Sequence, residues 1–390
     1  MGLDFLIRSF QNLATGDNWK MIVMWIIGAI LIFLAIKKEL EPSLLLPMGF
    51  GAILINLPFS GAIDQILSDT IEAPGVIEWL YKYGIDASEV MPLLLFIGIG
   101  AMIDFGPLLS NPKLLFFGAA AQFGIFATIV LAVLCGFNLS DAASSGIIAA
   151  ADGPTSILVG NLLKTQYLAA VIVVAYSYMA LVPIIQPMAI KAVTTKKERA
   201  IKMAYNPKKV SRASKILFPI IVTIIAGLIA PASIALVGML MFGNLLRECG
   251  VLNTLSDAAQ KMLANLITLL LGITVAFSMK ADAFIRIETL MIMGFGLFGF
   301  VMDSVGGVMF AKLINIFLPK SKKINPMVGA AGISAFPMSA RVVQKLGLKT
   351  DPSNHLLMHA LSANVSGQIG SVVAGGVVLA LVPMMLTGVI

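Results

Sequence analysis

The sequence predicts an all-α protein that crosses a membrane several times, with two inverted-topology repeats whose broken or re-entrant helices meet near the membrane midplane. Three observations predict this fold class. The 390-residue chain is 58% hydrophobic and only 12% charged, whereas soluble domains carry about 25% charged residues. Apolar segments recur along the whole chain, and several are shorter than the roughly 20 residues that a crossing helix needs. Short motifs of the first half also return, in the same order, in the second half.

The chain divides into four parts. The first part, residues 1–17, lacks the long apolar core of a signal peptide and is expected to lie as an amphipathic segment at the membrane interface. The third part, residues 192–214, is a loop that contains most of a cluster of nine Lys and Arg residues, in which Glu198 is the one acidic residue. The positive-inside rule therefore places this loop in the cytoplasm. No nucleic-acid-binding motif accompanies these charges, and nucleic acid is not an expected partner. In chain order the parts are the interfacial segment, the first membrane repeat, the basic loop and the second membrane repeat: residues 1–17, 18–191, 192–214 and 215–390.

The internal duplication rests on matching short motifs. Each match alone is weak, because glycine, alanine and proline are common in this chain, but four matches in one order favour a true repeat. In membrane carriers such repeats often have inverted topology and build an ion site where their broken helices meet. The matched pairs are Pro42 with Pro231, Asn111 with Asn325, the Gly-Ala-Ala at 118–120 with that at 329–331, and Asp152 with Asn364.

An acidic residue and two helix breakers interrupt the apolar stretch "AAADGPTSIL" at residues 149–158. A carboxylate such as Asp152 costs roughly 2.5–3.5 kcal/mol at the centre of a bilayer, and Gly153 and Pro154 disrupt the helical hydrogen bonds around it. The break frees backbone carbonyls and N–H groups. With the carboxylate they form a set of hard oxygen donors that suits a small monovalent cation such as Na⁺. The alternative is that Asp152 only caps the following half-helix.

Further oxygen donors flank this break and a second predicted break near Asn364. A carboxylate, amides and hydroxyls, without a cluster of His and Cys, favour an alkali cation over a transition metal. The candidates are Thr155 and Ser156 at the first break and Asn364, Ser366, Gln368 and Ser371 at the second.

Two tyrosines, Tyr176 and Tyr178, lie on the next predicted span. Either could place a phenol beside Asp152, where it could carry a proton. The ordinary alternative is packing with a satisfied hydroxyl.

The segment "INPMVGAAGISAFPMSARVVQK", residues 324–345, sets polar groups in a stretch of small residues. Small residues such as Gly329 allow helices to approach closely. Arg341 is either an interfacial anchor or a guanidinium that captures a carboxylate from water. Most of the other charges in apolar regions, which include Asp104 and Asp303, are expected near span ends.

Together the motifs "GIIAAADGPTSI", "NPMVGAAGISAFPMSARVVQK", "DPSNHLLMHA" and "SANVSGQIGS" resemble the β subunit of the sodium-pumping, biotin-dependent decarboxylases. This family includes the oxaloacetate, methylmalonyl-CoA, glutaconyl-CoA and malonate enzymes. The resemblance implies that Asp152 binds sodium and that Tyr178 is the functional tyrosine. It further implies an Asn-Pro-x-x-Gly element and a second broken helix that supply site residues: Asn325, Gly329, Ser334, Arg341 and Asn364.

The resemblance also implies an activity, membrane decarboxylation of carboxybiotin with proton consumption and outward Na⁺ transport. Arg341 and Ser334 would receive carboxybiotin, Tyr178 would donate the proton, and Na⁺ would bind Asp152, Asn325, Ser334 and Asn364. The expected partners are a carboxyltransferase (α) subunit, a biotin carrier subunit, a small membrane subunit (γ or δ) and further copies of this chain, in the inner cell membrane.

Two absent motifs agree with this implied activity. The chain has no Ala-Met-Lys-Met biotinylation site, so biotin must arrive on a partner. It also has no G-x-x-x-x-G-K-[ST] loop, so ATP is not the direct energy source. The alternative function is a Na⁺-coupled carrier of an organic anion that performs no chemistry. A cation/proton antiporter would use Asp152 but not Arg341, and a membrane scaffold would use neither.

Overall fold

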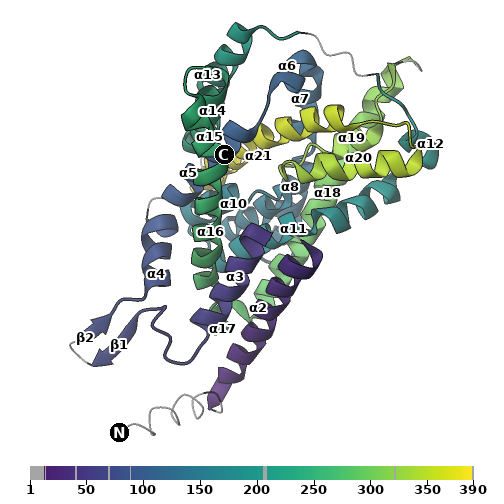
Figure 1. Cartoon of the computed structure of the whole chain (residues 1–390). Coiled ribbons are helices and arrows are strands. Elements are labelled where there is room, and N and C mark those ends of the chain that lie inside the picture. Colours follow the sequence, from purple (N-terminus) through teal and green to yellow (C-terminus); the bar gives the residue numbers. More distant parts are fainter. Residues whose placement is uncertain are drawn as a thin grey trace.

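A computed structural model describes most of the chain (Figure 1). The described residues are 13, 15–39, 42–68, 71–87, 89–204, 209–319 and 322–388. Most of the predicted interfacial segment, residues 1–12 and 14, lies outside them.

The described chain is almost entirely helical, and we keep the labels of Figure 1 throughout. The first half contains η1 (Gly16–Asn18), α2 (Trp19–Lys38), α3 (Pro42–Ile55), β1 (Gln65–Ser68), β2 (Ile71–Ala73), α4 (Val76–Tyr81), η2 (Lys82–Asp86), α5 (Val90–Met102), α6 (Gly106–Ser110), η3 (Pro112–Leu114), α7 (Leu115–Ala120), α8 (Phe123–Leu134), α9 (Leu139–Gly146), η4 (Ile147–Ala150), α10 (Gly153–Leu162), α11 (Leu168–Val193) and α12 (Lys196–Arg199). The second half contains α13 (Arg212–Ile229), η5 (Pro231–Ser233), α14 (Ile234–Glu248), α15 (Asn253–Asp257), η6 (Ala258–Leu263), α16 (Ala264–Val275), η7 (Ala276–Met279), α17 (Ala281–Phe284), α18 (Ile287–Phe317), α19 (Pro326–Ala330), α20 (Met338–Thr350) and α21 (Leu357–Leu386).

Six described helices are long and apolar enough to cross a membrane, and two bent helix pairs could each add one more crossing. The outer helices α2 and α13 expose apolar side chains such as Phe33 (55% exposed) and Leu228 (79%), as lipid-facing helices do. The chain is therefore a multi-pass, helical membrane protein, and the predicted fold class is confirmed in that respect. The six are Gly16–Lys38, Pro112–Leu134, Arg212–Ile229, Asn253–Met279, Ile287–Phe317 and Leu357–Leu386.

A small β-hairpin is the one feature of the fold class that the sequence did not predict. Strands β1 and β2 pair antiparallel, with Gln65 opposite Ala73. The hairpin projects from one end of the molecule next to α4 (Figure 1).

The two halves pack against each other in a reciprocal way, and the duplication itself stays a prediction. Helix α3 of the first half packs on α16 of the second, and α14 of the second half packs on α5 of the first. In each pair a buried asparagine forms a hydrogen bond to a backbone carbonyl near the end of the partner helix. Asn56 donates to the Met279 carbonyl (2.8 Å), and Asn244 donates to the Ile103 carbonyl (2.9 Å). The inverted relation of the halves and the exact boundaries of the repeats stay predictions.

Candidate functional site

The apolar segment around Asp152 is interrupted as predicted. Helix α9 continues into η4, which ends at Ala150 and is followed by Ala151, whose φ of 51° places it in the left-handed region, and α10 starts at Gly153. Asp152 between them is extended, and its carboxylate accepts a hydrogen bond from the Thr155 N–H (3.4 Å). The capping role that we weighed as the alternative is therefore present, but it uses only one carboxylate oxygen.

The other oxygen of Asp152 is the centre of a hydroxyl cluster. Oδ2 accepts from the hydroxyls of Thr155 (2.8 Å) and Ser371 (2.8 Å) and from that of Ser334 (3.2 Å). Ser371 and Ser334 also bond to each other at 3.0 Å. Asp152 is 5% exposed, and among the described residues it forms no ion pair. We call Asp152, Thr155, Ser334 and Ser371 the oxygen cage.

The second interruption lies in a different place from the one predicted. Helix α21 runs unbroken from Leu357 to Leu386, so the predicted break at Asn364 is wrong. The chain is instead interrupted at residues 331–337, between α19 and α20. The two interruptions touch, because the Ser334 N–H donates to the Ala150 carbonyl (3.2 Å). Helix α21 can stay continuous because its glycines and serines let the irregular backbone approach a regular helix closely.

Asn364 and Gln368 on α21 hold the second interruption in position. The Asn364 amide donates to the Ile333 carbonyl (2.7 Å), and the Gln368 amide donates to the Ser334 carbonyl. The carbonyl oxygen of Asn364 is buried and has no hydrogen-bond partner in the part of the chain that the structure describes. The sequence therefore predicted a part for Asn364 next to the site, but its amide binds backbone and makes no hydrogen bond to Asp152.

Of the two tyrosines left open by the sequence, Tyr176 is the one beside the break. A Cβ atom at Gly153 would lie 2.3 Å from the Tyr176 ring carbon that carries the hydroxyl, so only glycine fits there. The Tyr176 hydroxyl is buried and has no hydrogen-bond partner among the described residues. The Tyr178 hydroxyl instead donates to the Met293 carbonyl of α18 (2.5 Å).

Asn325 and Gly329, which the resemblance implies for the site, lie around it rather than in the oxygen cage. Asn325 caps α19, and its amide donates to the carbonyls of Arg199 (2.9 Å) and Ile201 (2.8 Å). Gly329 crosses Gly307 of α18 so closely that a Cβ on it would lie 2.0 Å from the Gly307 carbonyl oxygen. Asn325 thus anchors the basic loop, and Gly329 allows a close backbone crossing.

Arg341 is exposed in the first turn of α20 and forms no ion pair with any described residue. It lines a cavity of about 360 Å³ together with Pro183 and Pro187 of α11. It follows Ser334 by seven residues, so a single segment carries both a cage hydroxyl and the exposed guanidinium.

Sequence reasoning missed Gln186, a buried amide of α11 that bridges both sides of the second interruption. Its Nε2 donates to the Ala330 carbonyl (2.8 Å) at the end of α19 and to the Ser339 hydroxyl (2.6 Å) at the start of α20. Helix α11 bends by 73° between Met179 and Leu181, where Pro183 cannot donate to the carbonyl four residues earlier. A glutamine between two prolines of an apolar helix was the available signal.

Asp303 is also placed differently from expectation, in the middle of α18 and fully buried. Its carboxylate accepts from the Gly124 N–H (2.5 Å) at the start of α8, so it satisfies a helix end that lies in the membrane interior. Asp303 is thus not among the charges near span ends, and its capping role was not predicted because a cap supplied by a neighbouring helix leaves no local sequence pattern.

Replacement of Asp303 by alanine is expected to destabilise the protein, and replacement by asparagine much less. Alanine would leave the Gly124 N–H unpaired at a cost of about 1–3 kcal/mol, whereas the asparagine carbonyl can still accept. Thermal unfolding of the purified variants in detergent would measure the difference. Equal midpoints for Asp303→Ala and Asp303→Asn would contradict the capping role.

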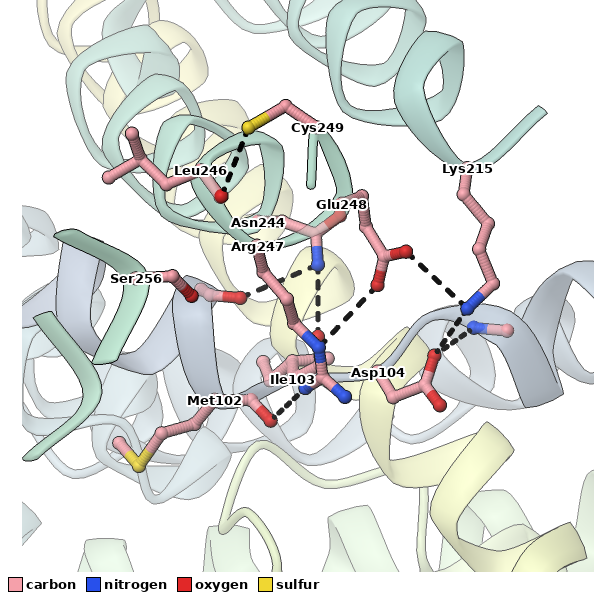
Figure 2. Close-up of polar contacts among 12 residues, drawn as sticks. Met102, Ile103, Asp104, Lys215, Asn244, Leu246, Arg247, Glu248, Cys249 and Ser256 are labelled. Atoms are coloured by element: carbon pink, nitrogen blue, oxygen red, sulfur yellow. Dashed lines mark hydrogen bonds and ion pairs between the residues drawn. The ribbon is translucent and has the colours of Figure 1, made fainter. Parts of the chain in front are cut away.

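Asp104 lies outside the oxygen cage, in a polar network that joins the ends of α5, α13 and α14 (Figure 2). Lys215 lies 3.4 Å from both Asp104 and Glu248, and Arg247 donates to the Met102 carbonyl (2.7 Å). These partners neutralise the charges and satisfy the last carbonyls of α5. Asp104 is 45% exposed, as expected for a charge near a span end.

The oxygen cage fits a small monovalent cation. It offers one carboxylate and three hydroxyl oxygens with free lone pairs, next to backbone carbonyls that the two interruptions expose. A buried carboxylate without a cationic partner is costly in a membrane interior and marks a functional site by default. No cluster of three or more His, Cys, Asp or Glu side chains that could hold a metal occurs in the described ranges.

The fold and this site define a class of protein, a multi-pass membrane protein with an acidic residue buried where two interrupted helices meet. Comparison with known proteins identifies the family. Residues 20–382 match the family described as "Na+-transporting oxaloacetate decarboxylase beta subunit", and the chain belongs to this family.

Relatives at 42–47% identity cover nearly the whole chain. The β subunit of methylmalonyl-CoA decarboxylase from Propionigenium modestum is 47% identical, with 94% of this chain and 96% of that protein covered. The β subunit of glutaconyl-CoA decarboxylase from Acidaminococcus fermentans is 46% identical, with 94% of each covered. The oxaloacetate decarboxylase β chain of Klebsiella pneumoniae is 42% identical over 92% of this chain and 94% of that protein. The chain is thus a decarboxylase β subunit of the Na⁺-transporting kind.

Proposed function

We propose that this chain decarboxylates carboxybiotin, delivered by a biotin carrier subunit, and couples the reaction to outward transport of Na⁺. The observation that carries the proposal is the oxygen cage, a buried carboxylate with three hydroxyl partners and no cationic neighbour among the described residues. Family membership supports the decarboxylation half, and the cage supports the transport half.

The exposed Arg341 is our candidate for the residue that receives the substrate. Its guanidinium forms no ion pair with a described residue, and its planar donors match a carboxylate. We propose that it orients the carboxyl group of carboxybiotin. The bond between the ureido nitrogen and the carboxyl carbon then breaks, CO₂ leaves, and the nitrogen takes up one proton.

The uptake of that proton is the step that the cage can couple to Na⁺. We propose that Na⁺ binds at Asp152, Thr155, Ser334 and Ser371. When Na⁺ leaves, a proton takes its place on the Asp152 carboxylate, and when Na⁺ binds again the carboxylate releases this proton, which goes to the ureido nitrogen. Tyr176, whose unpaired hydroxyl lies beside Gly153, is our candidate for passing this proton. Tyr178 is the functional tyrosine that the resemblance implies. We propose that it supports the site indirectly, through the hydrogen bond from its hydroxyl to the Met293 carbonyl of α18.

The family suggests the partners and the membrane location of this chain. The family consists of β subunits of multi-subunit decarboxylases. A carboxyltransferase subunit, a biotin carrier, a small membrane subunit and further copies of this chain are proposed as partners in the inner membrane. Which acid the complete enzyme decarboxylates depends on the carboxyltransferase.

The full chain reconstituted in vesicles tests the proposal. With a carboxylated biotin carrier we expect the loss of carboxybiotin and the movement of ²²Na⁺ to occur together, and we expect omission of the carrier to stop both. If an organic anion alone drives ²²Na⁺ across the vesicle membrane and carboxybiotin is not consumed, the chain is a carrier without chemistry and the proposal is wrong.

A further inference from the structure

An unusual concentration of positive charge surrounds Arg341. Two cavities of about 530 and 360 Å³ share Lys191, Leu346 and Lys349 in their walls and so form one continuous depression, which we call the basic trough. None of the described residues that line it is acidic. Its cations are Lys191, Lys196, Lys197, Arg199, Arg341, Lys345 and Lys349.

The cations of the trough are held close together without compensation. Arg341, Lys345 and Lys349 are spaced by four residues on α20, so they share one face of that helix. Like charges at this spacing destabilise a helix, and no described acid pairs with any of the three. An anionic partner that covers this face would relieve the repulsion.

Nearby acids do not serve this purpose because each is already engaged. Glu198 pairs with Lys312 at 2.9 Å. Asp351 accepts from the Ser353 hydroxyl (2.7 Å) and pairs with Lys202 (3.0 Å), and these contacts, those of Ser353 first, lower the pKa of Asp351 to about 2.

The wall of the trough formed by residues 194–201 is also fixed in position. The Arg199 carbonyl accepts from the amides of Asn325 (2.9 Å) and Asn354 (2.9 Å), and the Arg199 guanidinium donates to the Thr194 carbonyl (2.5 Å). Helix α12 contacts both α19 and α20, and Figure 1 shows the three together at one end of the molecule. The trough is therefore a preformed surface rather than a loose basic tail.

We propose that the basic trough docks an acidic face of the biotin carrier protein. This inference rests on the proposed function and adds the surface that recognises the partner. Carboxybiotin brings a single carboxylate, which Arg341 alone can bind, so the six remaining cations exceed what the small substrate needs. A protein that carries several acidic side chains around its biotinylated lysine supplies the missing negative charge.

Initial rates with carrier-borne and with free carboxybiotin test this inference in the full chain reconstituted in vesicles of neutral lipid. For Lys345→Glu/Lys349→Glu we expect KM for the carboxylated carrier to rise about tenfold or more with kcat at saturation retained, because opposite charges govern encounter and register. The KM for free carboxybiotin should change much less. In the unmodified chain, raising the salt from about 0.05 M to about 0.3 M should raise KM for the carrier, because salt screens such attraction.

A matched double variant controls for net charge. Lys113 and Lys82 are exposed lysines outside the trough, and Lys113→Glu/Lys82→Glu should leave KM for the carrier unchanged. Equal losses with carrier-borne and free carboxybiotin would overturn the inference in favour of a small-molecule role for these lysines. An unchanged carrier KM in Lys345→Glu/Lys349→Glu, or a dependence on anionic lipid in place of the carrier, would also overturn it. If the unmodified chain consumes neither substrate, the proposed function itself fails.

Discussion

Asp152→Asn is expected to abolish ²²Na⁺ transport in vesicles and to lower sodium-dependent decarboxylation about 100-fold or more. This change is equivalent to about 3 kcal/mol. Asparagine has the same size, and its carbonyl can still accept from the hydroxyls of Thr155 and Ser371, so the fold should persist. The cage would lose the only charge that can balance a cation in a membrane interior.

The control for this experiment is Asp104→Asn, which also removes one aspartate charge. Asp104 is 45% exposed and shares Lys215 with Glu248, so transport should stay within about twofold of the unmodified chain, because exposed ion pairs contribute little. Thermal unfolding of both variants would show that neither result reflects a loss of structure. Sodium-dependent turnover by Asp152→Asn at the normal rate would refute the coupling.

The second large effect is expected from Tyr176→Phe, and its matched control is Tyr178→Phe. Tyr176→Phe should raise the Na⁺ concentration for half-maximal decarboxylation about tenfold and shift the pH profile, because it removes the unpaired hydroxyl beside Asp152. Tyr178→Phe removes a bond to the Met293 carbonyl, worth about 1 kcal/mol. It should change stability and maximal rate while the half-saturating Na⁺ concentration stays the same.

Sodium titrations of decarboxylation at several pH values measure both tyrosine variants. If Tyr178→Phe alone shifts the sodium dependence, proton exchange belongs to Tyr178 and the assignment to Tyr176 is wrong. If neither variant shifts it, no phenol takes part in the exchange.

Much of the fold could be predicted because it follows from composition. A chain this apolar must form helices that satisfy their own backbone in lipid, and the break at Asp152 is visible as three consecutive residues that disfavour a membrane helix. The hairpin was not predictable in the same way, because short strands in a connection depend on local pairing rather than on a long periodic pattern.

The site was predictable where a residue acts within its own segment. Asp152 and Thr155 lie three residues apart, and Ser334 and Ser371 could be named as oxygen donors in polar motifs of apolar segments. The break expected near Asn364 was wrong because "SANVSGQIGS" is rich in residues that favour breaks but forms part of the regular helix α21. This helix packs against the irregular residues 331–337.

Contacts between distant helices account for the remaining differences. Asp303 satisfies the start of α8 from 179 residues away, and Asn325 binds the carbonyl of Arg199 from 126 residues away. Tyr176 and Tyr178 are two residues apart on one helix and so point in nearly opposite directions, and only the neighbouring helices decide which of the two faces the break. None of these relations leaves a signal in local spacing.

Gln186 has a mechanical consequence. Its side chain binds both flanks of the second interruption from the part of α11 that follows the bend. We therefore expect a displacement of this part of α11 to move the buried Ser334 and the exposed Arg341 in the same direction. A protein that docks at the surface around Arg341 would then exert force directly on the oxygen cage.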